Sequence, residues 1–80
     1  MWFVYILNSK TFDRFYIGLT SNLENRLNSH NSKKVKSTKP FVPWKMIYFE
    51  EFETRTDARK REKYFKSSAG RRWRKQNLGH

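Results

Sequence analysis

Two strand-like runs near the N-terminus constrain the fold more than any other feature of the sequence. Residues 2–8, WFVYILN, are bulky and apolar and contain no breaker, and residues 14–19, RFYIGL, resume the pattern after the turn-rich segment SKTFD. Aromatic and branched residues suit a pleated surface. Two such runs joined by a short polar connection predict an antiparallel hairpin.

The register of this hairpin decides which side chains share a face. With a turn centred near residues 10 and 11, Tyr5 lies opposite Tyr16 and both side chains point to the same side of the sheet. Gly18 then interrupts the second strand two residues later. Glycine in a strand often marks a bulge or the close approach of a ligand or another backbone. We therefore expect Gly18 to leave space at the edge of a functional cluster, where a phosphate backbone can come close.

A capping box predicts the first helix. In SNLE, residues 21–24, Ser21 can accept from the amide three residues on while the glutamate reaches back. The helix should cover about residues 22–30. At about 100° per residue, Arg26 and His30 project on the same side as its leucines. Two polar residues are thus expected on the face that looks inward.

The second half of the chain predicts one more strand and two more helices. WKMIYFEEF, residues 44–52, is strand-like, and TRTD, residues 54–57, is a second capping box. The helix that follows should run to about residue 67, with Glu62 on its inward side. SSAG interrupts it, and a last short basic helix is expected over about residues 68–78.

The charge balance favours a polyanionic partner. Lysine and arginine total 18 against 7 acidic residues, which gives a formal charge of +11 over 80 residues. Nucleic acid is the first expectation and an anionic membrane the second, but a membrane-binding helix would need one long apolar and basic stripe, which SSAG interrupts. The segment 31–43 reads as a mobile basic loop. The candidate nucleic-acid contacts are Lys33, Lys34, Lys36, Lys39, Lys66, Arg71 and Arg72.

The absence of cysteine and of a long apolar N-terminal segment predicts a cytoplasmic protein. The chain has no cysteine, which suits a reducing cytoplasm. Its apolar N-terminal residues are too few to span a bilayer and follow no basic segment, so neither a signal peptide nor a membrane anchor is expected.

Five side chains form a candidate constellation. Each of the inward polar residues has a structural explanation by itself, such as a satisfied core histidine or an ion pair. Taken together, and with two helices flanking the sheet face that carries the tyrosines, they offer a carboxylate, a guanidinium, an imidazole and two phenols. Phosphodiester hydrolysis uses such groups to hold Mg²⁺, activate water and stabilise charge on phosphate. The residues are Tyr5, Tyr16, Arg26, His30 and Glu62.

These residues resemble a known family. VYI at 4–6 and YIG at 16–18 are similar to the paired signature of the GIY-YIG nuclease domain, and ENRLNSH and ARKREKYFK are similar to its later motifs in type, order and spacing. The resemblance covers residues 2–66 and is strongest to small stand-alone bacterial members, which are related to the nuclease domain of the excinuclease UvrC. The first tripeptide reads Phe3-Val4-Tyr5, so it keeps the tyrosine of the motif and lacks its glycine.

The resemblance implies a single α+β domain over residues 1–80, with a small three-stranded, mainly antiparallel sheet flanked by helices. It also implies DNA cleavage that depends on one divalent ion, Mg²⁺ or Mn²⁺, in repair or recombination. Glu62 would hold the metal and Arg26 would contact the scissile phosphate. Tyr5 and Tyr16 would position or deprotonate the attacking water, with His30 hydrogen-bonded among them.

Other readings stay open on the sequence. The same basic surfaces would serve a nucleic-acid-binding module that does not cleave its ligand. Metal-free chemistry by His30 and the tyrosines is a second alternative. A partner-binding adaptor is a third, which the sequence neither supports nor excludes. RNA is not excluded as the ligand, and phosphate contacts carry no sequence preference. Glu62 is the discriminating residue, because a carboxylate near the phosphate repels a polyanion unless it holds a metal.

Overall fold

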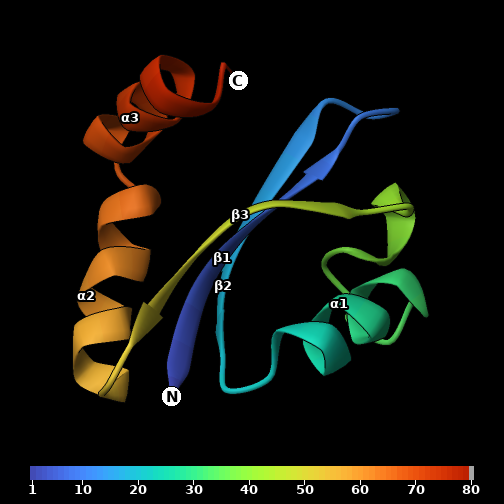
Figure 1. Ribbon diagram of the computed structural model, residues 1–80. Helices are drawn as coiled ribbons and strands as arrows, with labels where there is room; N and C mark the ends of the chain where they lie inside the picture. The colour runs from blue at the N-terminus through green and yellow to red at the C-terminus, as the bar shows by residue number, and fades with distance from the viewer. Residues whose placement is uncertain (80) are drawn as a thin grey trace.

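The computed structural model describes residues 1–79 and confirms the α+β class (Figure 1). Its elements follow the order β1 (Trp2–Ser9), β2 (Arg14–Thr20), α1 (Leu23–Asn31), a short 3₁₀ turn η1 (Lys39–Phe41), β3 (Lys45–Phe52), α2 (Arg55–Phe65) and α3 (Ser68–Leu78). No helix in the described part of the chain is long and apolar enough to cross a bilayer.

The strands form one antiparallel sheet in the order β2-β1-β3, so β1 is central and β2 is an edge. Tyr5 pairs with Gly18, and Tyr16 pairs with Leu7. The expected Tyr5–Tyr16 pairing is wrong because the turn is centred one residue later than assumed: Ser9 pairs with Arg14, so the hairpin is centred between residues 11 and 12. The partner of Tyr5 therefore shifts by two residues, an even number, so both tyrosines keep the same face.

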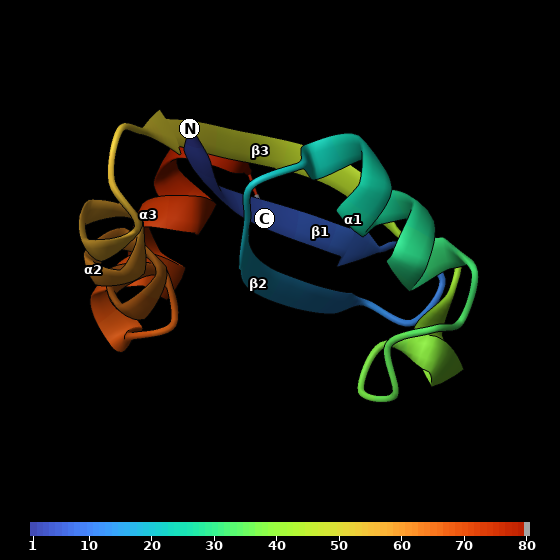
Figure 2. The ribbon, with the colours of Figure 1, turned by 90° about the horizontal axis from the view of Figure 1, so that it is seen from below.

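The helices divide between the two faces of the sheet (Figure 2). Along β1, Val4 and Ile6 pack in one cluster with Ala58 and Phe65 of α2. The alternate residues of β1 pack in a second cluster with the leucines of α1. The expectation that two helices flank one face is therefore wrong: side chains alternate along a strand, and each helix covers a different set.

The helix caps match the expected motifs in part. Asn22, and not Ser21, caps α1, because its side chain accepts from the amide of Asn25. Thr54 caps α2 as expected, through the amide of Asp57. Helix α2 ends at Phe65 rather than near residue 67, because Ser67 caps the next helix.

The basic segment between α1 and β3 is fastened at its centre and its end. The Asn31 side chain accepts from the backbone amide of Trp44 at 2.7 Å and donates to its carbonyl at 3.0 Å. The Trp44 indole donates to the carbonyl of Thr38. Thr38 and Trp44 are both buried, so this loop is packed against α1 while its lysines remain exposed.

Candidate active site

The hydroxyl of Tyr5 is the centre of a hydrogen-bonded cluster on the α1 face. It lies 3.0 Å from Nε2 of His30, and Nε of Arg26 donates to it at 3.2 Å. Tyr5 and His30 are both fully buried, whereas Arg26 is partly exposed. Both helical residues face inward, as the helical period predicts, because they are one turn apart on α1.

Thr38 determines the direction of the protons in this cluster. Its hydroxyl donates to the Val35 carbonyl at 3.3 Å, since a carbonyl can only accept. The same oxygen lies 2.8 Å from Nδ1 of His30, so it accepts from a protonated Nδ1. Neutral His30 then has a free lone pair on Nε2, and the Tyr5 hydroxyl donates to it. Sequence analysis missed Thr38, which bears no motif and meets His30 only through the folding of the loop.

Burial keeps these groups uncharged near neutral pH. Desolvation, and then the positive charge of Arg26, lowers the pKa of His30 from 6.5 to about 4. Desolvation also raises the pKa of Tyr5 to about 12, partly offset by the hydrogen bond from Arg26. The pKa of Arg26 is raised, first by that hydrogen bond to Tyr5 and further by the neighbouring Tyr16. The guanidinium is thus a permanent charge held between two phenols.

Gly18 has a different function from the expected one. A Cβ built on it would lie 2.8 Å from Cε1 of Tyr5 and nearer still to Cζ and the hydroxyl oxygen. The space above Gly18 is therefore filled by the Tyr5 ring, and no phosphate backbone can enter it. The glycine lets the ring of Tyr5 lie across β2, so that its hydroxyl reaches α1.

Tyr16 is the more accessible of the two phenols. It is half-buried on the edge strand β2, and its ring centroid lies 4.8 Å from that of His30 and 6.3 Å from that of Tyr5. Two neighbouring phenols thus differ in environment, because Tyr5 is on the central strand and is sealed by α1, whereas Tyr16 borders solvent.

Glu62 approaches this cluster from the other side of the sheet. It is 8% exposed on α2, and its carboxylate pairs with Lys66 at 3.2 Å and with Arg59 at 3.7 Å. No hydrogen bond joins it to the tyrosines among the described residues, but its charge is one of the smaller causes that raise the pKa of Tyr5. The inward position is as expected, and the carboxylate is already neutralised by two exposed cations.

The donor set around Glu62 suits one kind of metal site. In residues 1–79, no three acidic, histidine or cysteine side chains gather closely enough to form a cage for a metal ion. Mg²⁺ commonly uses one or two carboxylates and completes its shell with waters and substrate phosphates. Glu62 therefore fits an ion that is bound together with a phosphate, and residues 1–79 do not supply an all-protein metal cage.

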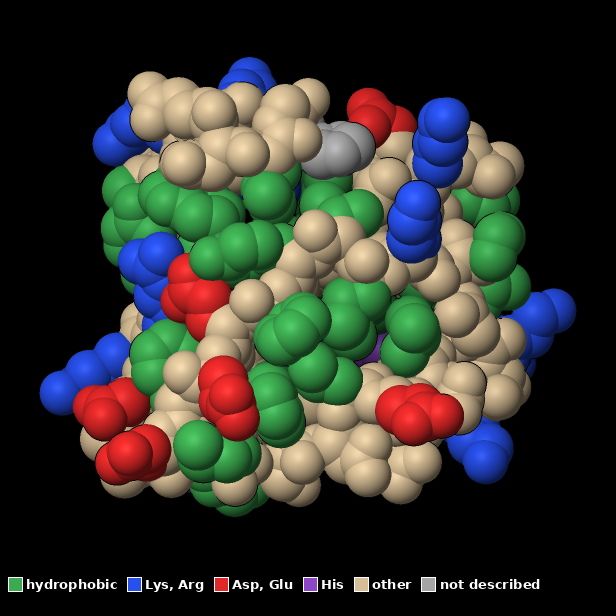
Figure 3. Space-filling model, viewed as in Figure 1, with side chains coloured by type: hydrophobic (Ala, Val, Ile, Leu, Met, Phe, Trp, Pro, Cys, Tyr) green, Lys and Arg blue, Asp and Glu red, His purple; other side chains and the backbone are tan. Residues whose placement is uncertain are grey.

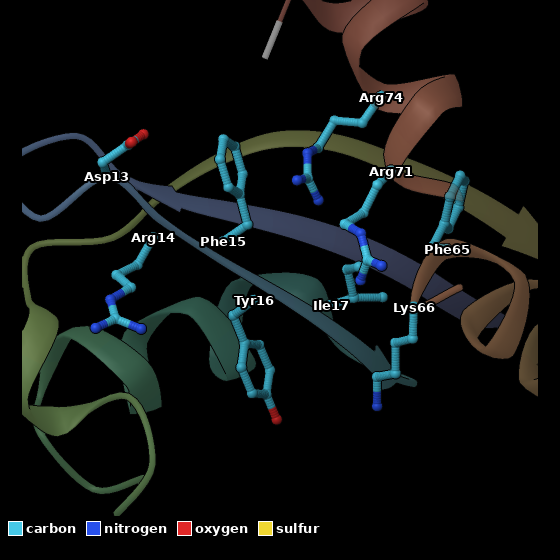
Figure 4. Close-up of a pocket in the computed structure, with 9 residues that line it drawn as sticks. All are labelled: Asp13, Arg14, Phe15, Tyr16, Ile17, Phe65, Lys66, Arg71 and Arg74. Atoms are coloured by element: carbon cyan, nitrogen blue, oxygen red, sulfur yellow. The ribbon is translucent and has the colours of Figure 1, made fainter. Parts of the chain in front are cut away.

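The predicted nucleic-acid contacts fall into separate places. Lys66 and Arg71 line a groove beside Tyr16 (Figure 4). The four loop lysines lie around η1 on the α1 side of the sheet, whereas α3 lies on the other side, and Arg72 is exposed on α3 outside the lining of that groove. Two further groove arginines, Arg14 and Arg74, were not among the predicted contacts, although Arg14 begins β2 next to the motif tyrosine.

Comparison with known proteins identifies one family. Residues 1–77 match the family described as GIY-YIG catalytic domain. A UPF0213 protein of Clostridium perfringens, CPE1444, is 43% identical over 67 residues, which cover 82% of this chain and 71% of the relative. A UPF0213 protein of Limosilactobacillus reuteri is 35% identical over 82 residues, covering 99% of this chain and 84% of the relative. The UPF0213 protein YazA of Bacillus subtilis is 37% identical over 65 residues, covering 80% and 65%. No solved structure matches the chain significantly.

Proposed function

We propose that this chain, which belongs to the GIY-YIG family of nuclease domains, is a metal-dependent endonuclease that hydrolyses phosphodiester bonds in DNA. The observation that carries the proposal is the hydrogen-bonded chain from Arg26 through Tyr5 to His30 and Thr38. It holds a permanent cation in place at a partly exposed point, where a phosphate can meet it.

Arg26 stabilises the charge that builds on the phosphate. Its Nε–H is directed to Tyr5, which leaves the terminal nitrogens of the guanidinium for phosphate oxygens. A donor that is already oriented does not have to reorganise as the negative charge develops. Tyr5, His30 and Thr38 act through Arg26 as positioning residues.

Tyr16 is the phenol that meets the attacking water. It lies near enough to Arg26 to interact with its charge and borders solvent, whereas the Tyr5 hydroxyl is enclosed and directed at His30. A phenol oxygen can accept a hydrogen bond from the attacking water and so position it beside the phosphate held by Arg26. Tyr16→Phe should therefore reduce cleavage strongly with little effect on folding, and Tyr5→Phe should also disturb the fold.

Glu62 would hold the divalent ion, Mg²⁺ or Mn²⁺, which supplies an activated water and neutralises phosphate charge. In the free protein, Lys66 and Arg59 balance the carboxylate. Both are exposed side chains that can turn to solvent or substrate when the ion binds, since surface ion pairs contribute little. We place this activity in the cytoplasm, in line with a chain that has no cysteine. A role in DNA repair or recombination is proposed from the family resemblance alone.

The decisive experiment is a cleavage panel with Mg²⁺ or Mn²⁺ over nicked, flapped, branched and duplex DNA and matched RNA. Glu62→Gln should abolish cleavage and keep or strengthen binding, because it removes a repulsive charge without changing shape. Glu53→Gln, on an exposed residue between β3 and α2, is the matched control and should cleave like the wild type. If no metal-dependent product forms on any substrate, the proposal fails.

The second candidate is a nucleic-acid-binding module that does not cleave. One observation favours it: the ion pairs of Glu62 with Lys66 and Arg59 give this carboxylate a structural reason to be present. Under this alternative the wild type forms no metal-dependent product, so there is no cleavage for Glu62→Gln to abolish. DNA binding without cleavage across the same panel of substrates would favour this second candidate.

A further inference from the structure

A groove runs along the unpaired edge of β2, between this strand and helix α3. It has a volume of about 450 Å³, within the range of small-ligand sites. Arg71 and Arg74 extend from α3 towards the strand, and Lys66 extends from the end of α2 (Figure 4). The lining residues are Asp13, Arg14, Phe15, Tyr16, Ile17, Phe65, Lys66, Arg71 and Arg74.

The groove concentrates positive charge. Four of its lining side chains are cationic, against the single acid Asp13. Burial, and then the neighbouring charge of Arg71, lowers the pKa of Arg74, so the two guanidiniums repel each other. The Arg74 guanidinium stacks 4.0 Å from the centroid of the Phe15 ring, which holds it over the strand. Together the two guanidiniums raise the positive potential along this part of β2.

The groove is continuous with the basic loop. Arg14 stacks over the Phe41 ring at 4.8 Å, and Phe41 belongs to η1 together with Lys39. The β2 edge thus connects the lysines of the loop to the arginines of α3. Acidic side chains instead gather where β3 meets α2 (Figure 3). The acids of that region are Glu50, Glu51, Glu53 and Asp57.

We propose that the sugar–phosphate backbone of one nucleic-acid strand lies in this β2-edge groove, with Arg14, Arg71 and Arg74 on its phosphates. Guanidinium groups bind phosphate oxygens through paired donors, which suits a backbone that is read without regard to sequence. The strand leads past Tyr16, which lines both the groove and the candidate site. The inference rests on the proposed function only in taking nucleic acid as the ligand, and it deepens that function by naming the path of the strand.

Salt dependence of binding tests the path. A fluorescein-labelled single-stranded DNA is titrated in EDTA, so that no cleavage occurs, at several salt concentrations. Arg71→Gln/Arg74→Gln should lower the slope of log K against log salt by about 1.4, since each phosphate contact on a single strand contributes about 0.7. The control is Lys60→Gln/Lys63→Gln on the outward face of α2, which removes the same charge from another basic surface.

The outcomes separate cleanly. A larger fall in slope for the groove variant than for the control supports the path, and an equal or smaller fall overturns it. If loss of the Arg74–Phe15 stacking unfolds the first variant, Arg14→Gln/Arg71→Gln replaces it, because both of these side chains are exposed. A protein that binds through this groove but never cuts DNA would refute the nuclease and keep the path. A protein that cuts DNA, but whose groove variants keep the wild-type slope of log K against log salt, would support the nuclease and refute the path.

Discussion

Replacing Gly18 with alanine tests how the site is built. The new methyl group would lie 2.8 Å from Cε1 of Tyr5 and closer to Cζ and the hydroxyl oxygen. Carbon atoms pack at about 3.5–4.0 Å, so the ring has to move by about 1 Å. Inserting a methyl group into a packed core costs about 1–3 kcal/mol. Moving the hydroxyl also weakens its bonds to His30 and Arg26, each worth about 1 kcal/mol.

The expected total is therefore about 2–4 kcal/mol of unfolding free energy, which for a domain of this size lowers Tm by at least about 10 °C. Cleavage, measured under conditions where the variant stays folded, should fall about 100-fold, because a displacement of about 1 Å in a catalytic group has an effect of that order. Urea unfolding and initial cleavage rates measure the two effects separately.

A double-mutant cycle with Tyr5→Leu identifies the cause. Leucine keeps an apolar side chain on β1 but lacks the ring tip that lies over Gly18, so the added methyl group should cost under about 1 kcal/mol in that background. Gly79→Ala adds no contact within 4 Å but strains the left-handed C-cap of α3 at φ 71°, so it should lower stability slightly and leave cleavage unchanged. An equal cost of Gly18→Ala in both backgrounds would refute the assignment of Gly18 to the Tyr5 ring.

Three further expectations follow from the buried histidine and the loop. The lowered pKa of His30, about 4 against 6.5, means that the unfolded chain binds a proton between these values and the folded chain does not. The contribution of His30 to the free energy of unfolding is thus fully present above pH 6.5 and declines towards pH 4 by up to about 3 kcal/mol. Urea unfolding at several pH values should show this decline, and His30→Gln should lack that part of it. Thr38→Val should reduce cleavage about tenfold, because one hydrogen bond is lost, and should shift the ¹⁵N resonances of His30 away from the Nδ1-protonated tautomer. Thr38→Ser should restore both the cleavage rate and the resonances. Wild-type His30 resonances in Thr38→Val would contradict the assigned tautomer. Lys33→Ala/Lys36→Ala should weaken DNA binding and flatten its salt slope by about one unit per lost phosphate contact, and an unchanged slope would remove the loop from the binding surface.

The strands and helices could be predicted from the sequence because their signals are local. Bulky runs on either side of a turn define the first two strands, and the threonine cap places the start of α2. The common face of Tyr5 and Tyr16 was also predictable, since an error of two residues in the pairing leaves the alternation intact.

What could not be predicted depends on tertiary contacts. No local signal tells which face of the sheet a helix will cover, so Glu62 was placed with α1 although α2 packs on the other side. Thr38 meets His30 only because Asn31 and Trp44 close the loop. Gly18 was recognised as special, but the occupant of its space is the Tyr5 ring, which only the true register reveals.

The burial of Tyr5 and His30 has an evolutionary consequence. Both side chains are fully enclosed and belong to the packing between α1 and the sheet. A descendant that had lost its chemistry would still be selected to keep them, because their loss would unfold the domain. Arg26 is partly exposed, and Glu62 is buried but belongs to neither apolar cluster, so selection for packing would constrain both less strongly. Among relatives of this chain, those two positions, rather than the tyrosine that defines the motif, should distinguish working enzymes from domains that retain only the architecture.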